Sequence, residues 1–187
     1  MSILVTGGAG YIGSHVTRLL QQRGETVVVV DNLSSGITAR IQDAKLLDLD
    51  LASSNAIELL KATFAQHDVT AVIHLAARKQ VGESVAKPEW YYQQNVGGMS
   101  NLLTAMHESN VKKLVFSSSA ATYGMPDVPA VTEDTVCKPI NPYGETKLVG
   151  EWMVDAAAAA WVSRNNPSRL SYGPPLDLPS SHHKIGR

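Results

Sequence analysis

Two side chains four positions apart, Tyr143 and Lys147, have the spacing and chemistry for proton transfer. They open a stretch of helix-forming sequence, and residues i and i+4 lie on the same face of a helix. An ammonium group beside a phenol stabilises the phenolate and lowers the pKa of the phenol. Tyr143 is therefore predicted to exchange a proton near neutral pH. Taken alone, a Tyr-x-x-x-Lys pair is more often an exposed helix face.

A serine-rich segment supplies a third candidate group. Ser119 follows the apolar run of residues 113–117, and the carboxyl ends of parallel strands meet at one edge of a sheet. The Ser119 hydroxyl is predicted to hydrogen-bond the substrate oxygen whose proton Tyr143 exchanges. The predicted catalytic residues are thus Ser119, Tyr143 and Lys147, and the first two also contact the substrate.

A glycine-rich turn at residues 7–13 has the spacing of a phosphate-binding loop. Gly8, Gly10 and Gly13 satisfy G-x-G-x-x-G, and Gly7, Gly10 and Gly13 satisfy the looser G-x-x-G-x-x-G. Glycine suits these positions because the chain turns sharply, a pyrophosphate approaches the backbone, and the helix packs closely on the sheet. Amides at the start of the following helix then bind the anion. A purely structural tight turn is the alternative.

Asp31 lies where an acidic side chain accepts hydrogen bonds from the adenosine ribose of a dinucleotide. Its negative charge would repel a 2'-phosphate, so the predicted cofactor is NAD rather than NADP. The alternative role for Asp31 is a cap of the turn at residues 31–34.

Strands and helices alternate along the chain in a way that positions these groups. Short apolar or β-branched runs predict strands, and helical periodicity fills the intervals between them. The uninterrupted valines that follow Thr26 in residues 26–30 predict a strand covered on both faces. The fold class is therefore α/β, a doubly wound parallel sheet of the Rossmann type. The predicted strands are residues 3–6, 26–30, 45–49, 71–75 and 113–117, and the predicted helices are residues 11–22, 55–66, 88–109 and 143–161.

Two segments lack periodicity. Residues 119–142 are rich in Pro, Thr and Asp and are predicted to form a long loop, a kind of segment that is often functional in compact domains. Residues 162–187 contain four prolines and five serines and are predicted to hold no strand or amphipathic helix. The predicted NAD-binding domain is therefore residues 1–161, followed by an irregular tail.

The composition is typical of a soluble globular protein. With 44% hydrophobic residues, 18% charged residues and a net charge of -1, the chain offers no basis for binding nucleic acid or an anionic membrane. The single cysteine, Cys137, leaves no internal disulfide and is typical of a reducing compartment. Without an apolar run of membrane-spanning length or a signal sequence, the predicted location is the cytoplasm. No metal site is predicted.

Several segments resemble the extended short-chain dehydrogenase/reductase family, and within it the branch of nucleotide-sugar 4-epimerases. The glycine turn and the Tyr143/Lys147 pair are similar to the whole superfamily, whereas KQVGES at 79–84 and SAATYG at 119–124 resemble the epimerase branch. The other similar segments are VTGGAGYIGSH at 5–15, DNLS at 31–34, HLAA at 74–77, NVGG at 95–98 and NPYGETK at 141–147.

The resemblance implies a tightly held NAD that takes a hydride from C4 of a UDP-hexose while Tyr143 takes the hydroxyl proton. The 4-keto sugar turns over and receives the hydride on its other face, which interconverts UDP-glucose and UDP-galactose. Ser119 would bind the C4 oxygen, and Lys147 would hold the nicotinamide ribose. The implied cofactor contacts are Gly7, Gly10, Tyr11, Ile12, Gly13, Asp31, Asn32, Asp50, Leu51, Leu75, Ala76, Ala77, Lys79, Gln94 and Asn95.

The chain departs from this family at three places. Gln94 stands where the family more often has asparagine, and the short segment 36–50 leaves both Asp48 and Asp50 as candidates for the adenine contact. After Trp161, neither the expected strand with an Arg-Tyr-Phe-Asn-type segment nor the smaller substrate domain is recognisable. We therefore expect a chain without the C-terminal substrate domain, truncated by a reading-frame shift near Trp161.

Three functions stay open at this point: a UDP-hexose 4-epimerase, a related dehydratase, and a non-catalytic NAD-binding remnant. Dehydratases usually place acidic residues directly after the serine, whereas Ala120 and Ala121 follow Ser119. Loss of the substrate domain would remove most contacts to UDP, which normally support turnover. It would also leave a sheet edge uncovered, a source of instability. A homodimer through the helix of Tyr143 is implied by the resemblance only.

Overall fold

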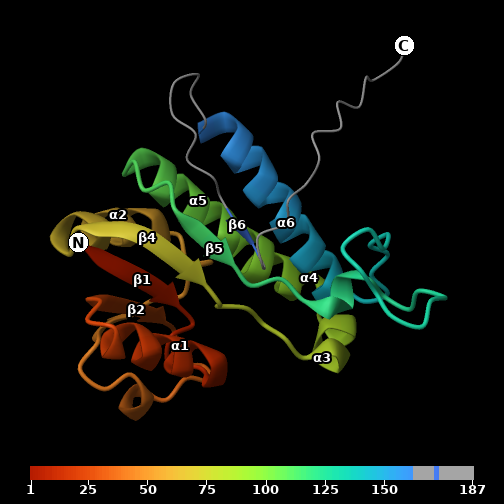
Figure 1. Cartoon of the computed structure of the whole chain (residues 1–187), viewed down its shortest axis with the longest axis horizontal. Coiled ribbons are helices and arrows are strands. Elements are labelled where there is room, and N and C mark those ends of the chain that lie inside the picture. The colour runs from red at the N-terminus through yellow and green to blue at the C-terminus, as the bar shows by residue number, and fades with distance from the viewer. Residues whose placement is uncertain (162–170, 173–187) are drawn as a thin grey trace.

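The computed structural model describes residues 1–161 and 171–172 (Figure 1). Its centre is a six-stranded sheet in the order β3-β2-β1-β4-β5-β6, in which every strand pair is parallel. The fold therefore confirms the predicted parallel, Rossmann-like class. The strands are β1 (Ser2–Thr6), β2 (Val27–Asp31), β3 (Lys45–Asp48), β4 (Val69–His74), β5 (Leu114–Phe116) and β6 (Ser171–Tyr172).

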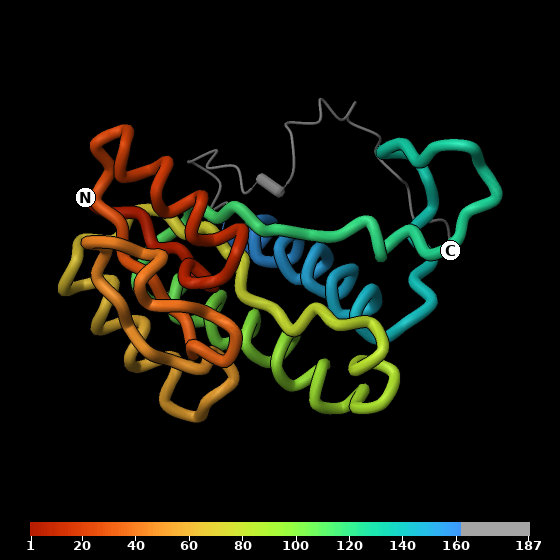
Figure 2. Tube along the Cα trace, turned by 90° about the horizontal axis from the view of Figure 1, so that it is seen from below, coloured from red at the N-terminus to blue at the C-terminus, as the bar shows by residue number. Residues whose placement is uncertain are grey.

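Helices follow most of the strands, and α5 and α6 lie side by side (Figures 1 and 2). In the described part of the chain, every helix falls short of the length and apolar character that crossing a bilayer requires. The helices are α1 (Tyr11–Gln22), α2 (Ala56–Gln66), α3 (Val81–Ala86), α4 (Pro88–Tyr91), α5 (Gly98–Glu108) and α6 (Pro142–Trp161). Shorter turns are the 3-10 segments η1 (Thr38–Arg40) and η3 (Ala120–Thr122) and the π-helical η2 (Tyr92–Gly97).

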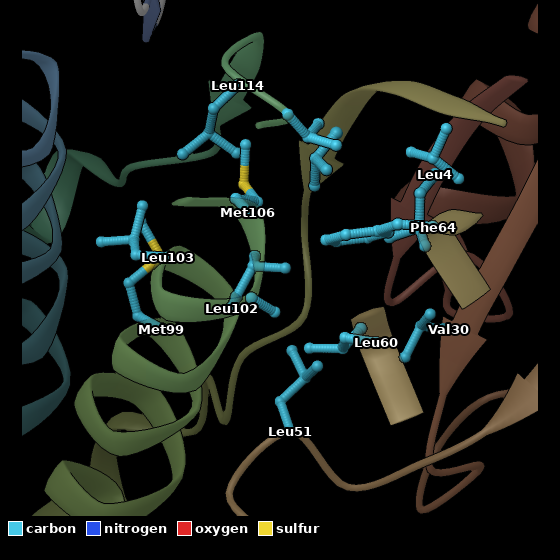
Figure 3. Close-up of a cluster of buried hydrophobic side chains, with 14 of the residues drawn as sticks. Leu4, Val30, Leu51, Leu60, Phe64, Met99, Leu102, Leu103, Met106 and Leu114 are labelled. Atoms are coloured by element: carbon cyan, nitrogen blue, oxygen red, sulfur yellow. The ribbon is translucent and has the colours of Figure 1, made fainter. Parts of the chain in front are cut away.

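Successive residues of the central strands point into two different hydrophobic cores. Leu4 and Val28 belong to the larger core with side chains of α2, α5 and α6 (Figure 3). Val5 and Val29 belong to the smaller core, against which Leu20 of α1 packs. This alternation follows from the two-residue period of a strand. All five residues of β2 are buried, as predicted for a strand covered on both faces.

The helical region predicted at residues 88–109 is one continuous path through α4, η2 and α5, with the π turn between two α-helices. The six-residue helix α3, Val81–Ala86, was not predicted. Short helices such as this one carry too few turns to show a periodic pattern.

The prediction that no strand follows Trp161 is wrong at Ser171–Tyr172. This segment forms β6 and pairs with β5 in the register Val115 to Ser171 and Phe116 to Tyr172. It covers the edge of β5, so the expected uncovered edge is also wrong there. A two-residue strand is defined by its hydrogen bonds to a neighbour rather than by its own sequence pattern. The rest of the predicted tail lies outside the described residues.

Candidate functional site

A cleft of about 340 Å³ opens at the carboxyl ends of β1, β2 and β4. From β1 the sheet extends through β2 and β3 in one direction and through β4, β5 and β6 in the other. Doubly wound sheets bind ligands where the strand order reverses in this way. Apart from Lys147, all the residues predicted to contact the cofactor line this cleft: Gly7, Gly10, Tyr11, Ile12, Gly13, Asp31, Asn32, Asp50, Leu51, Leu75, Ala76, Ala77, Lys79, Gln94 and Asn95.

The glycine turn between β1 and α1 is packed too closely for larger residues. A Cβ atom on Gly13 would lie 2.0 Å from the Gly7 carbonyl oxygen, and one on Gly7 would lie 2.7 Å from the Ala76 amide nitrogen. Gly7 also has a φ of +69°, which a side chain would disfavour. Gly8 does not line the cleft; it packs against Val29, where a Cβ atom would lie 2.7 Å from a methyl carbon. The turn therefore brings the start of α1 against the sheet edge.

The first turn of α1 lines the cleft with Tyr11, Ile12 and Gly13. Gly10 caps the helix without a side-chain hydrogen bond, so the amides of the first turn remain available to a ligand. A Cβ atom on Gly10 would meet only the Gly7 carbonyl oxygen within 4 Å, at 3.2 Å. The close turn and the free amides fit the diphosphate of a dinucleotide.

Asp31, at the end of β2, is buried beside this turn. Its Oδ2 accepts a hydrogen bond from the Ala9 amide at 3.0 Å, and its Oδ1 accepts one from the Leu33 amide at 2.9 Å. Asp31 therefore does cap the turn after β2. Each carboxylate oxygen can accept more than one hydrogen bond, so this capping leaves Asp31 able to bind a ribose hydroxyl in the cleft.

Of the two aspartates proposed for the adenine end, Asp50 lines the cleft and Asp48 lies exposed in β3. Asp50 Oδ2 accepts hydrogen bonds from Asn32 Nδ2 at 3.4 Å and from Gln94 Nε2 at 3.3 Å. Gln94, at the position where the family more often has asparagine, therefore takes part in the wall of the cleft.

A neutral histidine forms part of the inner wall of the cleft. Burial, with a smaller contribution from the positive charge of Lys147, lowers the pKa of His74 to about 3. Thr6 Oγ1 accepts hydrogen bonds from the Leu75 amide at 3.2 Å and the Ala76 amide at 3.3 Å. The Thr6 hydroxyl can then donate its proton to His74 Nδ1, 2.7 Å away. Because Nδ1 accepts this hydrogen bond, the proton of the neutral imidazole lies on Nε2.

The three predicted catalytic residues do not line the cleft wall themselves. Lys147 is buried, and its Nζ donates a hydrogen bond at 2.8 Å to the carbonyl oxygen of Ser117, which does line it. Ser119 Oγ accepts from the Ala121 amide at 3.2 Å and caps η3. Tyr143 is half-buried at the start of α6, and its hydroxyl has no hydrogen-bond partner in residues 1–161.

A close contact between α6 and η3 brings the segments of Tyr143 and Ser119 together. A Cβ atom on Gly144 would lie 2.5 Å from the Ala121 carbonyl oxygen. Asn141 Oδ1 accepts from the Gly144 amide at 2.9 Å and caps the start of the helix. The structure therefore places Lys147 behind the cleft, and Ser119 and Tyr143 on neighbouring segments beside it.

Burial lowers the pKa of Lys147 to about 8 from its ordinary 10.5, which predicts a pH-dependent stability. Between these two values the unfolded chain binds more protons than the folded chain, so the free energy of unfolding rises with pH. We expect a rise of about 3 kcal/mol from pH 8 to pH 10.5 relative to Lys147→Met. Urea unfolding across this range measures it, with the exposed Lys45→Met as the control. If the free energy of unfolding changed with pH in the same way for the wild type and Lys147→Met, the prediction would be contradicted.

The sequence did not single out several residues that line the cleft, namely Ser34, His74, Arg78 and Trp90. Arg78 lies next to a predicted contact, and its guanidinium carbon is 4.7 Å from the centre of the Trp90 ring. The only sequence signal was position, because Arg78 directly follows the HLAA segment at the end of β4.

Known proteins resemble this chain in sequence and in structure. The UDP-glucose 4-epimerase of Halalkalibacterium halodurans is 48% identical over 153 residues, which cover 82% of this chain and 45% of that protein. The enzyme of the same name from Bacillus subtilis is 45% identical over 159 residues, covering 81% and 46%. The chain therefore spans about half the length of these curated relatives.

Solved structures agree with this comparison. UDP-glucose 4-epimerase from Brucella ovis in complex with NAD matches with a TM-score of 0.83 and 40% identity, over 91% of this chain and 50% of that one. The Thermus thermophilus enzyme in complex with NAD matches with a TM-score of 0.82 and 32% identity, over 92% and 53%. The model of the NAD dependent epimerase/dehydratase family matches residues 3–172, extending past Trp161 to include β6. This chain belongs to the NAD dependent epimerase/dehydratase family.

Proposed function

We propose that the chain acts as an NAD-dependent epimerase at C4 of a UDP-hexose and interconverts UDP-glucose and UDP-galactose. The observation that carries the proposal is that one cleft, at the reversal of strand order, gathers the glycine turn, Asp31 and the segment held by Lys147. The names of the similar proteins, which are UDP-glucose 4-epimerases, support the choice of reaction. Because the chain spans half of their length, the activity of the chain itself is part of the proposal.

We assign the roles from the hydrogen-bond donors and acceptors that each side chain has left unused. NAD, when bound, supplies a reversible acceptor for the hydride of C4. The Tyr143 phenol oxygen is unpaired in residues 1–161. As the phenolate it would take the proton of the C4 hydroxyl, and it would return that proton when the hydride goes back to C4. Ser119 holds the same oxygen with its hydroxyl. Lys147 uses one ammonium N–H on the Ser117 carbonyl, and its two other N–H groups would hold the hydroxyls of the nicotinamide ribose.

The chemistry of Asp31 supports NAD over NADP. Its two oxygens already accept amide hydrogen bonds from Ala9 in the glycine turn and from Leu33 in the turn after β2, which fixes the carboxylate in place. A fixed, buried negative charge disfavours the 2'-phosphate of NADP and favours hydroxyl donors.

A second candidate is NAD binding without turnover. The lining of the cleft favours this candidate. The glycine turn and Asp31 line the cleft, whereas Ser119 and Tyr143 do not. A dehydratase is not favoured, since Ala120 and Ala121 bring no acid next to Ser119.

One experiment separates the candidates. The purified chain is supplied with UDP-galactose, the formation of UDP-glucose is followed, and the bound NAD is released by denaturation and quantified. Turnover with retained NAD supports the epimerase. Retained NAD without turnover supports the second candidate, and retention of NADP as well as NAD would contradict the role given to Asp31.

A further inference from the structure

Five side chains in the cleft form a closed ring of hydrogen bonds. Arg78 Nη1 donates to Ser34 Oγ at 2.9 Å, and Ser34 Oγ donates to Asn32 Oδ1 at 2.7 Å. Asn32 Nδ2 and Gln94 Nε2 both donate to Asp50 Oδ2, at 3.4 and 3.3 Å. Gln94 Oε1 accepts from Arg78 Nε at 3.3 Å and closes the ring. The ring therefore joins the loops that follow β2, β3 and β4 to η2, which contains Gln94.

Arg78 is the member of this ring that carries a positive charge, and it is held from three sides. Its backbone is bound on both sides of the Cα atom by Asn95, whose Oδ1 accepts from the Arg78 amide at 2.8 Å and whose Nδ2 donates to the Arg78 carbonyl at 3.0 Å. Its guanidinium lies over the Trp90 ring. An arginine so fixed loses little rotamer freedom when it binds a ligand, because its planar donors are already oriented.

The link from Arg78 to Ser34 crosses the cleft. Ser34 follows β2 and Arg78 follows β4, and β1 with its glycine turn lies between these two strands. All three segments line the same cleft. The hydrogen bond of the guanidinium therefore joins the segments on either side of the glycine turn, in the cleft that the first turn of α1 also lines. Two of the five guanidinium N–H groups are used in the ring, so three remain for phosphate oxygens.

We propose that Arg78 is a strap across the cleft that binds the diphosphate of the dinucleotide and slows its release. This inference rests on the NAD site of the proposed function. Planar bidentate pairing makes arginine well suited to phosphate oxygens, and the amides of the glycine turn bind the diphosphate from the opposite side. In the competing role, which we call the bracket, Arg78 does not contact the ligand. It only holds the loops in place through its hydrogen bonds to Ser34 and Gln94.

Binding measurements on three variants distinguish the strap from the bracket. Affinities for NAD, ADP and adenosine are measured by calorimetry, and the release rate of bound NAD is measured by dilution. For Arg78→Ala we expect about 10- to 100-fold weaker binding of NAD and ADP, the range for a hydrogen bond to a charged group, with adenosine unchanged. Arg78→Lys, which keeps the charge and loses the planar donors, is expected to lie between Arg78→Ala and the wild type.

Lys87→Ala is the matched control. Lys87 Nζ also lies over the Trp90 ring, 5.5 Å from its centre, but Lys87 is exposed and does not line the cleft. Its removal is expected to leave all three affinities unchanged. Thermal unfolding of each variant shows whether the fold is retained, and a folded Arg78→Lys keeps the comparison available if Arg78→Ala unfolds.

The outcomes separate this inference from the proposed function. Equal affinities of Arg78→Ala and the wild type for NAD would overturn the strap, as would an equal loss for adenosine and ADP, which would indicate the bracket. A wild-type chain that binds NAD but does not epimerise UDP-galactose contradicts the proposed function and leaves the strap in place. A wild-type chain that binds neither NAD nor ADP contradicts both.

Discussion

Replacing Tyr143 with phenylalanine is expected to lower the rate of conversion of UDP-galactose to UDP-glucose by about 10²- to 10⁴-fold, the contribution of a positioned acid–base group. The change removes only the hydroxyl of a half-buried ring at the start of α6, so packing and the cofactor cleft are preserved. The rate is measured at saturating substrate, and the NAD content of the variant is measured in parallel. NAD content is expected to match the wild type.

The control for this variant is another tyrosine on the same side of the molecule. The Tyr92 hydroxyl donates a hydrogen bond to Glu145 Oε2 at 2.8 Å. Tyr92 is exposed, Glu145 is half-buried, and neither lines the cleft. Tyr92→Phe removes the same atom and is expected to leave the rate within about twofold, since exposed substitutions change little. If Tyr143→Phe retained more than a tenth of the wild-type rate, another group would have to exchange the proton.

Gly13→Ala is expected to destabilise the fold by about 3 kcal/mol, at the upper end for overpacking, and to abolish retention of NAD. The added Cβ atom would lie 2.0 Å from the Gly7 carbonyl oxygen and 2.8 Å from the Gly8 Cα atom. These are backbone atoms, so no rotamer change can make room. The turn must move away from α1, which displaces the amides that we propose receive the diphosphate. Urea unfolding and quantification of released NAD measure the two effects.

Gly82→Ala gives the comparison without overpacking. Gly82 lies in α3, and a Cβ atom there would meet nothing within 4 Å. Alanine at a compatible helical position is expected to raise the free energy of unfolding by about 0.5 kcal/mol. A Gly13→Ala variant that unfolds at the same urea concentration as Gly82→Ala would show that the turn can relax, contrary to our prediction.

The main elements of the fold could be predicted because their sequence patterns extend over many residues. The valines of β2 and the long helix before Trp161 are examples, although β2 ends at Asp31 rather than one residue earlier. The helix α3 and the strand β6 could not be predicted in this way. Each is short, and β6 exists through its pairing with β5.

The site divides along a similar line. The glycine turn and Asp31 could be predicted from the local sequence. The spacing of the glycines indicates a tight turn, and an acidic residue at the end of the second strand indicates a contact to a ribose. Arg78 has only its position after the HLAA segment as a local signal, because its partners Ser34 and Gln94 lie 44 and 16 positions away in the chain. The contact of Lys147 with the Ser117 carbonyl spans 30 positions and likewise depends on how α6 packs on the sheet. Side-chain contacts of this kind follow from tertiary packing, which the local sequence does not encode.

The position of β1 in the middle of the sheet has a consequence for the order of folding during synthesis. β2 adds to one side of β1 and β4 adds to the other, and β5 and β6 then follow outward in chain order. Each later strand therefore finds its neighbour already synthesised, without waiting for a segment still inside the ribosome. Within residues 1–161 and 171–172, the last residue that lines the cleft is Ser117. These described walls of the cleft are thus present in the nascent chain before the helix with Tyr143 and Lys147 has emerged.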